Sequence, residues 1–153
     1  MCSQRIEKGI CMIEGEKVLI CGLSKESSIK ILKWVNDPEL KQYTGTIFPV
    51  SEFEHENWIR NRAESNTDKL FSIKEKKSNI DIGTIGLKNI DYINSNAEIY
   101  ISIGNNEFLS QNHSGGGKGY GTDAVLTFSN FCFDRLNLHK VYLKVFESNK
   151  RAI

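Results

Sequence analysis

AEIYISIG at 97–104, GGGKGYGT at 115–122 and TDAVLTFSNFCFDRL at 122–136 follow one another as a strand pattern, a glycine-rich segment and a helix pattern. The first segment alternates strictly, which predicts a strand with two distinct faces. Its apolar face carries Ala97, Ile99, Ile101 and Ile103, and its polar face carries Glu98, Tyr100 and Ser102. The third segment has an apolar stripe at helical spacing, formed by Val125, Phe128, Cys132 and Leu136. Residues 105–121 join the two as a loop longer than the roughly 12–15 residues usual for a connection, and such loops are often functional.

The glycine-rich segment favours an anion site, and phosphate is the simplest ligand. Glycines let backbone amides approach a ligand closely, and the following helix adds unpaired N–H groups and a positive dipole end. Lys118 could add a charge-assisted contact. The other interpretation is a surface loop with a glycine-rich turn.

Two common phosphate motifs do not fit this segment. A Walker A loop needs a glycine where Asn112 stands, and Ser or Thr where Gly119 stands. A dinucleotide fingerprint must follow its strand directly, whereas here a long loop intervenes.

The rest of the chain alternates between strand and helix patterns, which predicts a mixed α/β (α+β) fold. Strands are expected at 16–21, 70–76, 80–90 and 140–146. A helix is expected at 24–35, with Ile29, Leu32 and Val35 on its apolar face. Another begins at Ser51, because Ser51 and Glu54 have the spacing of a capping box.

Composition limits the class of protein. With 153 residues, a single domain over 1–153 is expected. Lys plus Arg is 20 and Asp plus Glu is 19, so the sequence has no basic excess for nucleic acid or anionic membranes. No apolar run approaches a membrane span. The four cysteines lack metal-ligand spacing, so we expect no metal and reduced thiols in a cytoplasmic protein.

GKGYGTDA at 117–124 resembles the acyl-CoA pyrophosphate loop of the GNAT N-acetyltransferase superfamily. WVNDPELKQYTG, SEFEHENWI, AEIYISIG, DRLNLHKVYLKVF and ESNKRAI resemble, in family order, other segments of the subgroup related to ribosomal-protein alanine acetyltransferases. The resemblance implies a mostly antiparallel sheet flanked by helices. Its fourth and fifth strands, 97–104 and 140–146, would splay apart around acetyl-CoA.

The resemblance also implies which residues bind acetyl-CoA. Backbone groups of Ile101, Ser102 and Ile103 would pair with the pantetheine arm, and the Ile103 amide would polarise the thioester carbonyl. The pyrophosphate would lie against Gly117, Lys118, Gly119, Tyr120, Gly121 and Thr122. Asn149 would contact the pantetheine side.

The implied reaction is direct attack of a primary amine, from a protein N-terminus or a small molecule, on the thioester. Glu98 is the candidate base, through water, because it lies on the polar face of its strand. Tyr100 and Ser102, on the same face, are candidate substrate-lining residues. For Glu98 the other interpretation is a carboxylate on a solvated strand face.

Three departures from the family pattern bear on activity. Gly116 stands where the loop motif has Gln or Arg, and residues 105–116 are longer than usual. The sequence ends at Ile153, before the family's acid tyrosine and last two strands. We therefore expect the isolated monomer to be poorly stable or inactive, and an exposed sheet edge favours a homodimer. A truncated, non-catalytic acyl-CoA-binding domain is the alternative function, and a nucleotide-binding module is a third.

Overall fold

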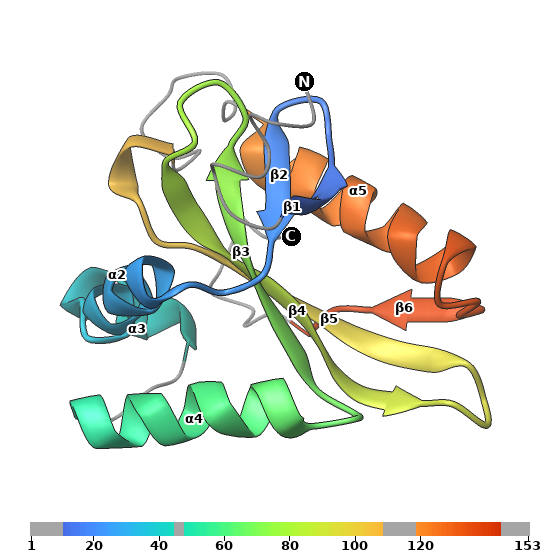
Figure 1. Cartoon of the computed structure of the whole chain (residues 1–153), viewed down its shortest axis with the longest axis horizontal. Coiled ribbons are helices and arrows are strands. Elements are labelled where there is room, and N and C mark those ends of the chain that lie inside the picture. The colour runs from blue at the N-terminus through green and yellow to red at the C-terminus, as the bar shows by residue number, and fades with distance from the viewer. Residues whose placement is uncertain (1–10, 45–47, 109–118, 145–153) are drawn as a thin grey trace.

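The computed structural model describes residues 11–44, 48–108 and 119–144 (Figure 1). In these residues six strands form one sheet, in the order β1-β2-β3-β4-β5-β6. The strands are β1 Cys11–Glu14, β2 Val18–Cys21, β3 Lys69–Glu75, β4 Asp81–Asp91, β5 Asn96–Ile103 and β6 Lys140–Tyr142. Neighbouring strands are antiparallel from β1 to β5, and β6 alone pairs in parallel, with β5.

Helices cover both faces of this sheet. They are α2 Lys25–Val35, α3 Pro38–Thr44, α4 Glu52–Glu64 and α5 Tyr120–Asp134, and η1 Asn106–Phe108 is a short 3-10 turn. Figure 1 shows α5 on one side of the sheet and α2, α3 and α4 on the other. The structure thus confirms the mixed, mostly antiparallel sheet flanked by helices.

The main core lies between α5 and the sheet. Ala124, Phe128 and Cys132 on α5 are fully buried. They belong to one apolar cluster with sheet residues such as Ile85 and Ile99. The predicted α5 stripe is therefore right at Phe128 and Cys132. It is wrong at Leu136, which follows the end of the helix and is exposed.

The face of α2 that is buried differs from the one that the sequence predicts. Ile29 is 59% exposed, whereas Ser27 and Ile31 are buried. The reason is Asp81, a buried carboxylate at the start of β4, which accepts a hydrogen bond from Ser27 Oγ at 3.0 Å. This polar contact turns the Ser27–Ile31 row toward the sheet, because residues four apart share one helix face.

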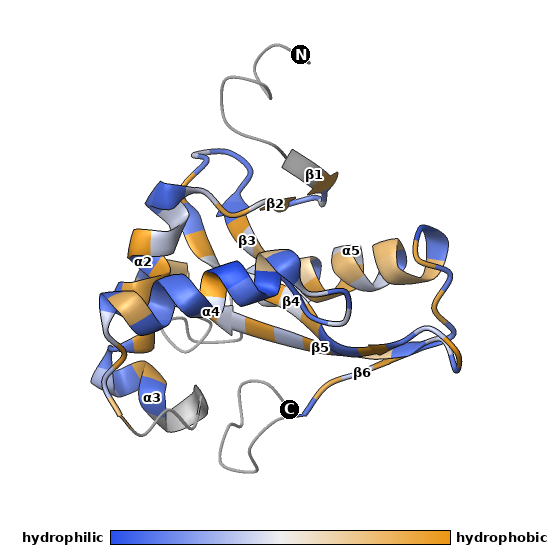
Figure 2. Ribbon diagram, turned by 60° about the horizontal axis from the view of Figure 1, so that its bottom comes forward, coloured by the Kyte–Doolittle hydropathy of each residue, from blue (hydrophilic) through white to orange (hydrophobic). Residues whose placement is uncertain are grey.

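The N-terminus of α4 matches its sequence signal. Ser51 Oγ accepts from the Glu54 N–H at 3.2 Å, and Glu54 Oε2 accepts from the Ser51 N–H at 2.8 Å. Figure 2 shows that α4 is mostly hydrophilic. His55 is its buried residue, with Nε2 2.9 Å from the Ser28 carbonyl oxygen of α2. A polar contact therefore helps to hold α4 against α2.

Several boundaries differ from the sequence prediction. β1 has no counterpart among the expected strands, and α3, which begins at Pro38, has none among the expected helices. Proline suits this position because the first helical residue needs no N–H partner within the helix. α5 begins at Tyr120 rather than Thr122. β6 ends at Tyr142, and the expected strand residues 145–146 lie outside the described part of the chain.

Candidate active site

β5 and β6 pair only near their first residues. The pairs run from Asn96 with Lys140 to Glu98 with Tyr142, and β5 then continues to Ile103. Within residues 11–44, 48–108 and 119–144, no strand pairs with 99–103 on the side away from β4. The splayed pair that the sequence predicts is therefore present, and it leaves an open edge along β5.

The backbone of this open edge has a defined direction. The Gly104 N–H donates to the Ile82 carbonyl on β4 at 2.9 Å, and the Ser102 carbonyl oxygen also lies against β4, at Gly83. Alternate residues of an antiparallel strand direct both backbone groups to the same neighbour. The N–H and C=O groups of Ile101 and Ile103 consequently face the open edge.

The polar face of β5 carries Glu98, Tyr100 and Ser102. Glu98 is 8% exposed, so the interpretation of a solvated surface carboxylate is wrong. Its Oε2 lies 3.6 Å from Lys144 Nζ, and Tyr142 of β6 is its partner in the parallel ladder. Tyr142 is a neighbour that sequence reasoning missed, because strand register is not visible in the sequence.

Tyr100 lies deep on this face. Its hydroxyl donates to the Lys69 carbonyl at 3.1 Å, and Lys88 Nζ lies 4.6 Å from its ring centroid. The ring covers Gly86, where a Cβ would stand 2.7 Å from the Tyr100 hydroxyl oxygen. Burial raises the pKa of Tyr100 far above its ordinary value. Tyr100 is therefore a hydrogen-bond donor, and not a base, at neutral pH.

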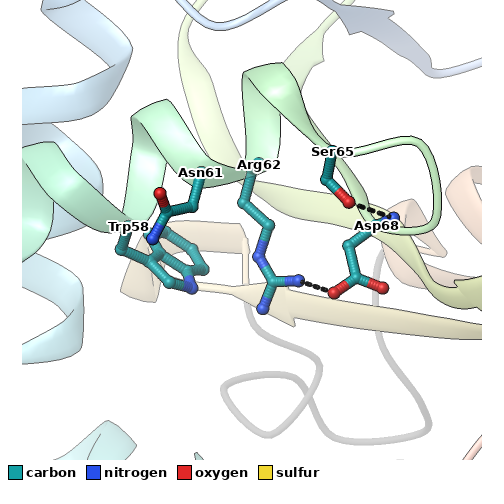
Figure 3. A pocket seen from close by; sticks show the side chains of 5 residues that line it. All are labelled: Trp58, Asn61, Arg62, Ser65 and Asp68. Atoms are coloured by element: carbon teal, nitrogen blue, oxygen red, sulfur yellow. Dashed lines mark hydrogen bonds and ion pairs between the residues drawn. The ribbon is translucent and has the colours of Figure 1, made fainter.

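A pocket of about 290 Å³ lies beside Tyr100, between the C-terminal half of α4 and the start of β3 (Figure 3). It is lined by Trp58, Asn61, Arg62, Ser65 and Asp68. Arg62 Nη1 donates to Asp68 Oδ2 at 2.6 Å, and the Arg62 guanidinium lies 5.5 Å from the Trp58 ring centroid. The pocket combines an aromatic ring, an amide, a hydroxyl and the ion pair of Arg62 with Asp68, and such groups can bind the polar end of a small molecule.

The residues of the predicted anion site lie partly in the described chain, at the start of α5. Gly119 precedes the helix with φ +80°, a left-handed conformation that favours glycine, and no side chain caps the helix there. Gly121 and Thr122 lie in the first turn. Gly117, Lys118 and Asn149 lie outside the described residues.

Tyr120 differs from its predicted role as a loop residue. It is the first residue of α5, and its ring packs edge-on against Phe108 with centroids 5.1 Å apart. Its hydroxyl donates a short hydrogen bond to Glu75 Oε2. This hydrogen bond, with burial, raises the pKa of Tyr120 to about 12. The side chain of Tyr120 therefore packs against η1 and bonds to β3, and its backbone begins the helix.

The described part of the chain contains neither a metal-binding cluster of side chains nor a membrane-spanning helix. Among the described residues, no group of three or more His, Cys, Asp or Glu side chains could hold a metal ion. No helix in that part of the chain is long and apolar enough to cross a membrane.

Comparison with known proteins places the chain in a family. The acetyltransferase (GNAT) domain matches residues 19–153. An N-acetyltransferase from Bacillus licheniformis, p20, described as uncharacterized, is 27% identical over 142 residues, which are 90% of this chain and 75% of the relative. A spermidine N(1)-acetyltransferase from Vibrio cholerae is 29% identical over 106 residues, which are 69% of this chain and 56% of the relative.

Solved structures agree with this placement. The crystal structure of spermidine N-acetyltransferase from Vibrio cholerae in complex with CoA and spermine aligns with a TM-score of 0.73 and 26% identity, over 89% of this chain and 75% of that one. A putative ribosomal-protein-serine acetyltransferase from Vibrio cholerae shares the fold, with a TM-score of 0.67 and 17% identity, over 90% of this chain and 75% of that one. The chain therefore belongs to the GNAT acetyltransferase family and is an acetyl-CoA-dependent N-acetyltransferase.

Proposed function

We propose that this chain transfers the acetyl group of acetyl-CoA to a primary amine, and that small polyamines are the favoured acceptors. The observation that carries the proposal is the open edge of β5. It presents backbone groups for an extended pantetheine arm on one side and a buried carboxylate, Glu98, on the polar face of the same strand.

In this proposal the cofactor lies along β5. The outward backbone groups of Ile101 and Ile103 pair with the pantetheine amides as an added strand would. The pyrophosphate reaches the start of α5, at Gly119, Gly121 and Thr122, where unpaired N–H groups and the helix dipole favour anions. The Ile103 amide stays the predicted donor to the thioester carbonyl. Ile101 faces the same edge, nearer the point where β5 and β6 part.

The chemistry then takes place on the polar face. The neutral amine attacks the thioester carbonyl carbon, a C–N bond forms, and the C–S bond breaks as the CoA thiolate leaves. Glu98 accepts the amine proton, directly or through one water. Tyr100 stays protonated and lines the acceptor side, together with Ser102.

The acceptor class rests on the surroundings of Tyr100. The adjacent pocket holds the Trp58 ring and the Asp68 carboxylate, and both kinds of group attract ammonium ions. Both contact the Arg62 guanidinium, so an ammonium group of the acceptor would take the place of Arg62 there. Similarity to spermidine acetyltransferases supports the same class. A protein N-terminus is the other acceptor that the sequence suggested.

An acetylation assay with matched acceptors tests this proposal. The protein is incubated with acetyl-CoA and either spermidine, a peptide with a free N-terminus, or the same peptide with a blocked one, and products are identified by mass spectrometry. We expect one acetyl group on spermidine and less on the free peptide. Transfer to the free peptide alone would replace the polyamine by a protein N-terminus. Saturable acetyl-CoA binding without transfer to any amine would favour the non-catalytic alternative.

A further inference from the structure

The turn between β1 and β2 is fixed to the first turn of α5 by one carboxylate. Asp123 accepts hydrogen bonds from three successive backbone N–H groups, those of Glu16 at 3.3 Å, Lys17 at 2.8 Å and Val18 at 3.1 Å. The turn also packs closely on the helix, because a Cβ at Gly15 would stand 2.6 Å from Thr127 Oγ1. The N-terminal hairpin therefore has a fixed position relative to the α5 N-terminus.

This arrangement places the side chain of Lys17 at the start of α5. A Cβ at Gly119, the residue that caps the helix, would stand 3.1 Å from Lys17 Nζ. Among the described residues, no other heavy atom outside the immediate neighbours of Gly119 comes within 4 Å of that point. The Lys17 ammonium group therefore lies beside the residue that precedes α5, although Lys17 is about a hundred residues away from Gly119 in sequence.

The charges around the helix N-terminus determine how Lys17 can contribute to phosphate binding. Two carboxylates lie nearby, those of Asp123 and Glu75, and negative charge opposes the binding of a phosphate. Both are engaged, Asp123 by the hairpin N–H groups and Glu75 by the Tyr120 hydroxyl. Lys17 adds a full positive charge beside the partial positive charge of the helix N-terminus, and both favour a phosphate.

We propose that Lys17 is a phosphate-binding residue of the acetyl-CoA site, and that Asp123 is the positioning residue that holds it there. Lys17 would contact the pyrophosphate oxygens from the turn between β1 and β2. The inference rests on the proposed function, because it assigns one more residue to the same cofactor site.

The test compares acetyl-CoA with S-acetyl-pantetheine, which carries the same thioester and no phosphate. For Lys17→Ala we expect Kd and KM for acetyl-CoA to rise about tenfold, as for the loss of one charge-assisted hydrogen bond at an exposed site. The kcat at saturation and the kcat/KM for S-acetyl-pantetheine should not change. Added salt should reduce the difference in Kd for acetyl-CoA between wild type and Lys17→Ala, because salt screens the charge of Lys17. Lys33→Ala, an exposed lysine in the last turn of α2, is the matched control.

Asp123→Asn tests the positioning role. It should weaken acetyl-CoA binding, and the double variant with Lys17→Ala should bind no more weakly than Lys17→Ala alone, because Asp123 acts through Lys17. Thermal unfolding checks that the variants fold. If Asp123→Asn does not fold, the comparison of Lys17→Ala with Lys33→Ala decides whether Lys17 binds phosphate.

The outcomes separate this inference from the proposed function. Wild-type protein that binds acetyl-CoA, with Lys17→Ala binding equally well, would overturn the role of Lys17 and leave the proposed function intact. An equal loss on both thioesters would also overturn it, because the effect would not depend on phosphate. Wild-type protein that binds no acetyl-CoA would overturn both.

Discussion

Glu98 is the residue on which the proposed chemistry depends. It is 8% exposed on the polar face of β5, where a carboxylate can accept a proton from an amine. We expect Glu98→Gln to lower kcat by about 10²–10⁴-fold, the usual contribution of a general base. KM for acetyl-CoA should stay the same, because Glu98 makes none of the proposed cofactor contacts.

The measurement is steady-state kinetics with spermidine. Glu64→Gln, an exposed glutamate at the end of α4, is the control and should keep wild-type kcat. A kcat for Glu98→Gln within twofold of wild type would remove the base role.

Three buried or bonded acidic protons make the stability of the fold sensitive to alkaline pH. Burial raises the pKa of Cys132 to about 11 and that of Tyr100 still higher, and the hydrogen bond to Glu75, with burial, raises that of Tyr120 to about 12. The folded state holds these protons more tightly than the unfolded state. The free energy of unfolding should therefore be steady below about pH 9 and fall as pH rises through 10 to 12.

Urea denaturation at a series of pH values measures this decline. Tyr100→Phe removes one of the three groups, so its decline should be shallower than that of wild type. A decline of unchanged steepness would show that Tyr100 is not one of the groups involved.

Strand β4 needs a glycine at position 86 so that β3 and β5 can both lie close to it. A Cβ at Gly86 would stand 2.1 Å from the Lys69 carbonyl oxygen of β3 and 2.7 Å from the Tyr100 hydroxyl oxygen of β5. We expect Gly86→Ala to lower the free energy of unfolding by about 1–3 kcal/mol, as overpacking does.

Gly121 is the matched comparison, since a Cβ there meets nothing within 4 Å. Gly121→Ala should raise the free energy of unfolding by about 0.5–1 kcal/mol, because alanine loses less entropy than glycine in a helix. Urea denaturation of both variants checks the opposite signs. Two variants that shift stability in the same direction would contradict this account of β4.

Features that depend on residues close together in the sequence could be predicted, whereas features that depend on distant residues could not. The capping box of Ser51 and Glu54 and the alternation of β5 are local patterns, and both are present in the structure. The burial of Ile31 rather than Ile29 depends on Asp81, which is 50 residues away from Ile31 in sequence and was not expected to bind Ser27. The contact of Asp123 with the β1–β2 turn also has no local signal.

The sheet separates the apolar core of the molecule from the pocket proposed to bind the acceptor. The face toward α5 holds the apolar core, and the opposite face carries Tyr100 and the pocket beneath α4. If the acceptor enters on this face, Trp58→Ala should raise KM for the amine about tenfold and leave KM for acetyl-CoA unchanged. Phe53→Ala on the same helix, 82% exposed, should change neither constant. Equal effects of both variants on amine KM would place the acceptor elsewhere.

The proposed function depends above all on acetyl-CoA binding along the open edge of β5, and residue-resolved amide hydrogen exchange can detect this binding. The amides of Tyr100 and Ser102 face β4, whereas those of Ile101 and Ile103 face the open edge. Saturating acetyl-CoA should slow exchange at Ile101 and Ile103 and leave Tyr100 and Ser102 almost unchanged. Saturable binding of acetyl-CoA with no added protection at Ile101 and Ile103 would contradict the claim.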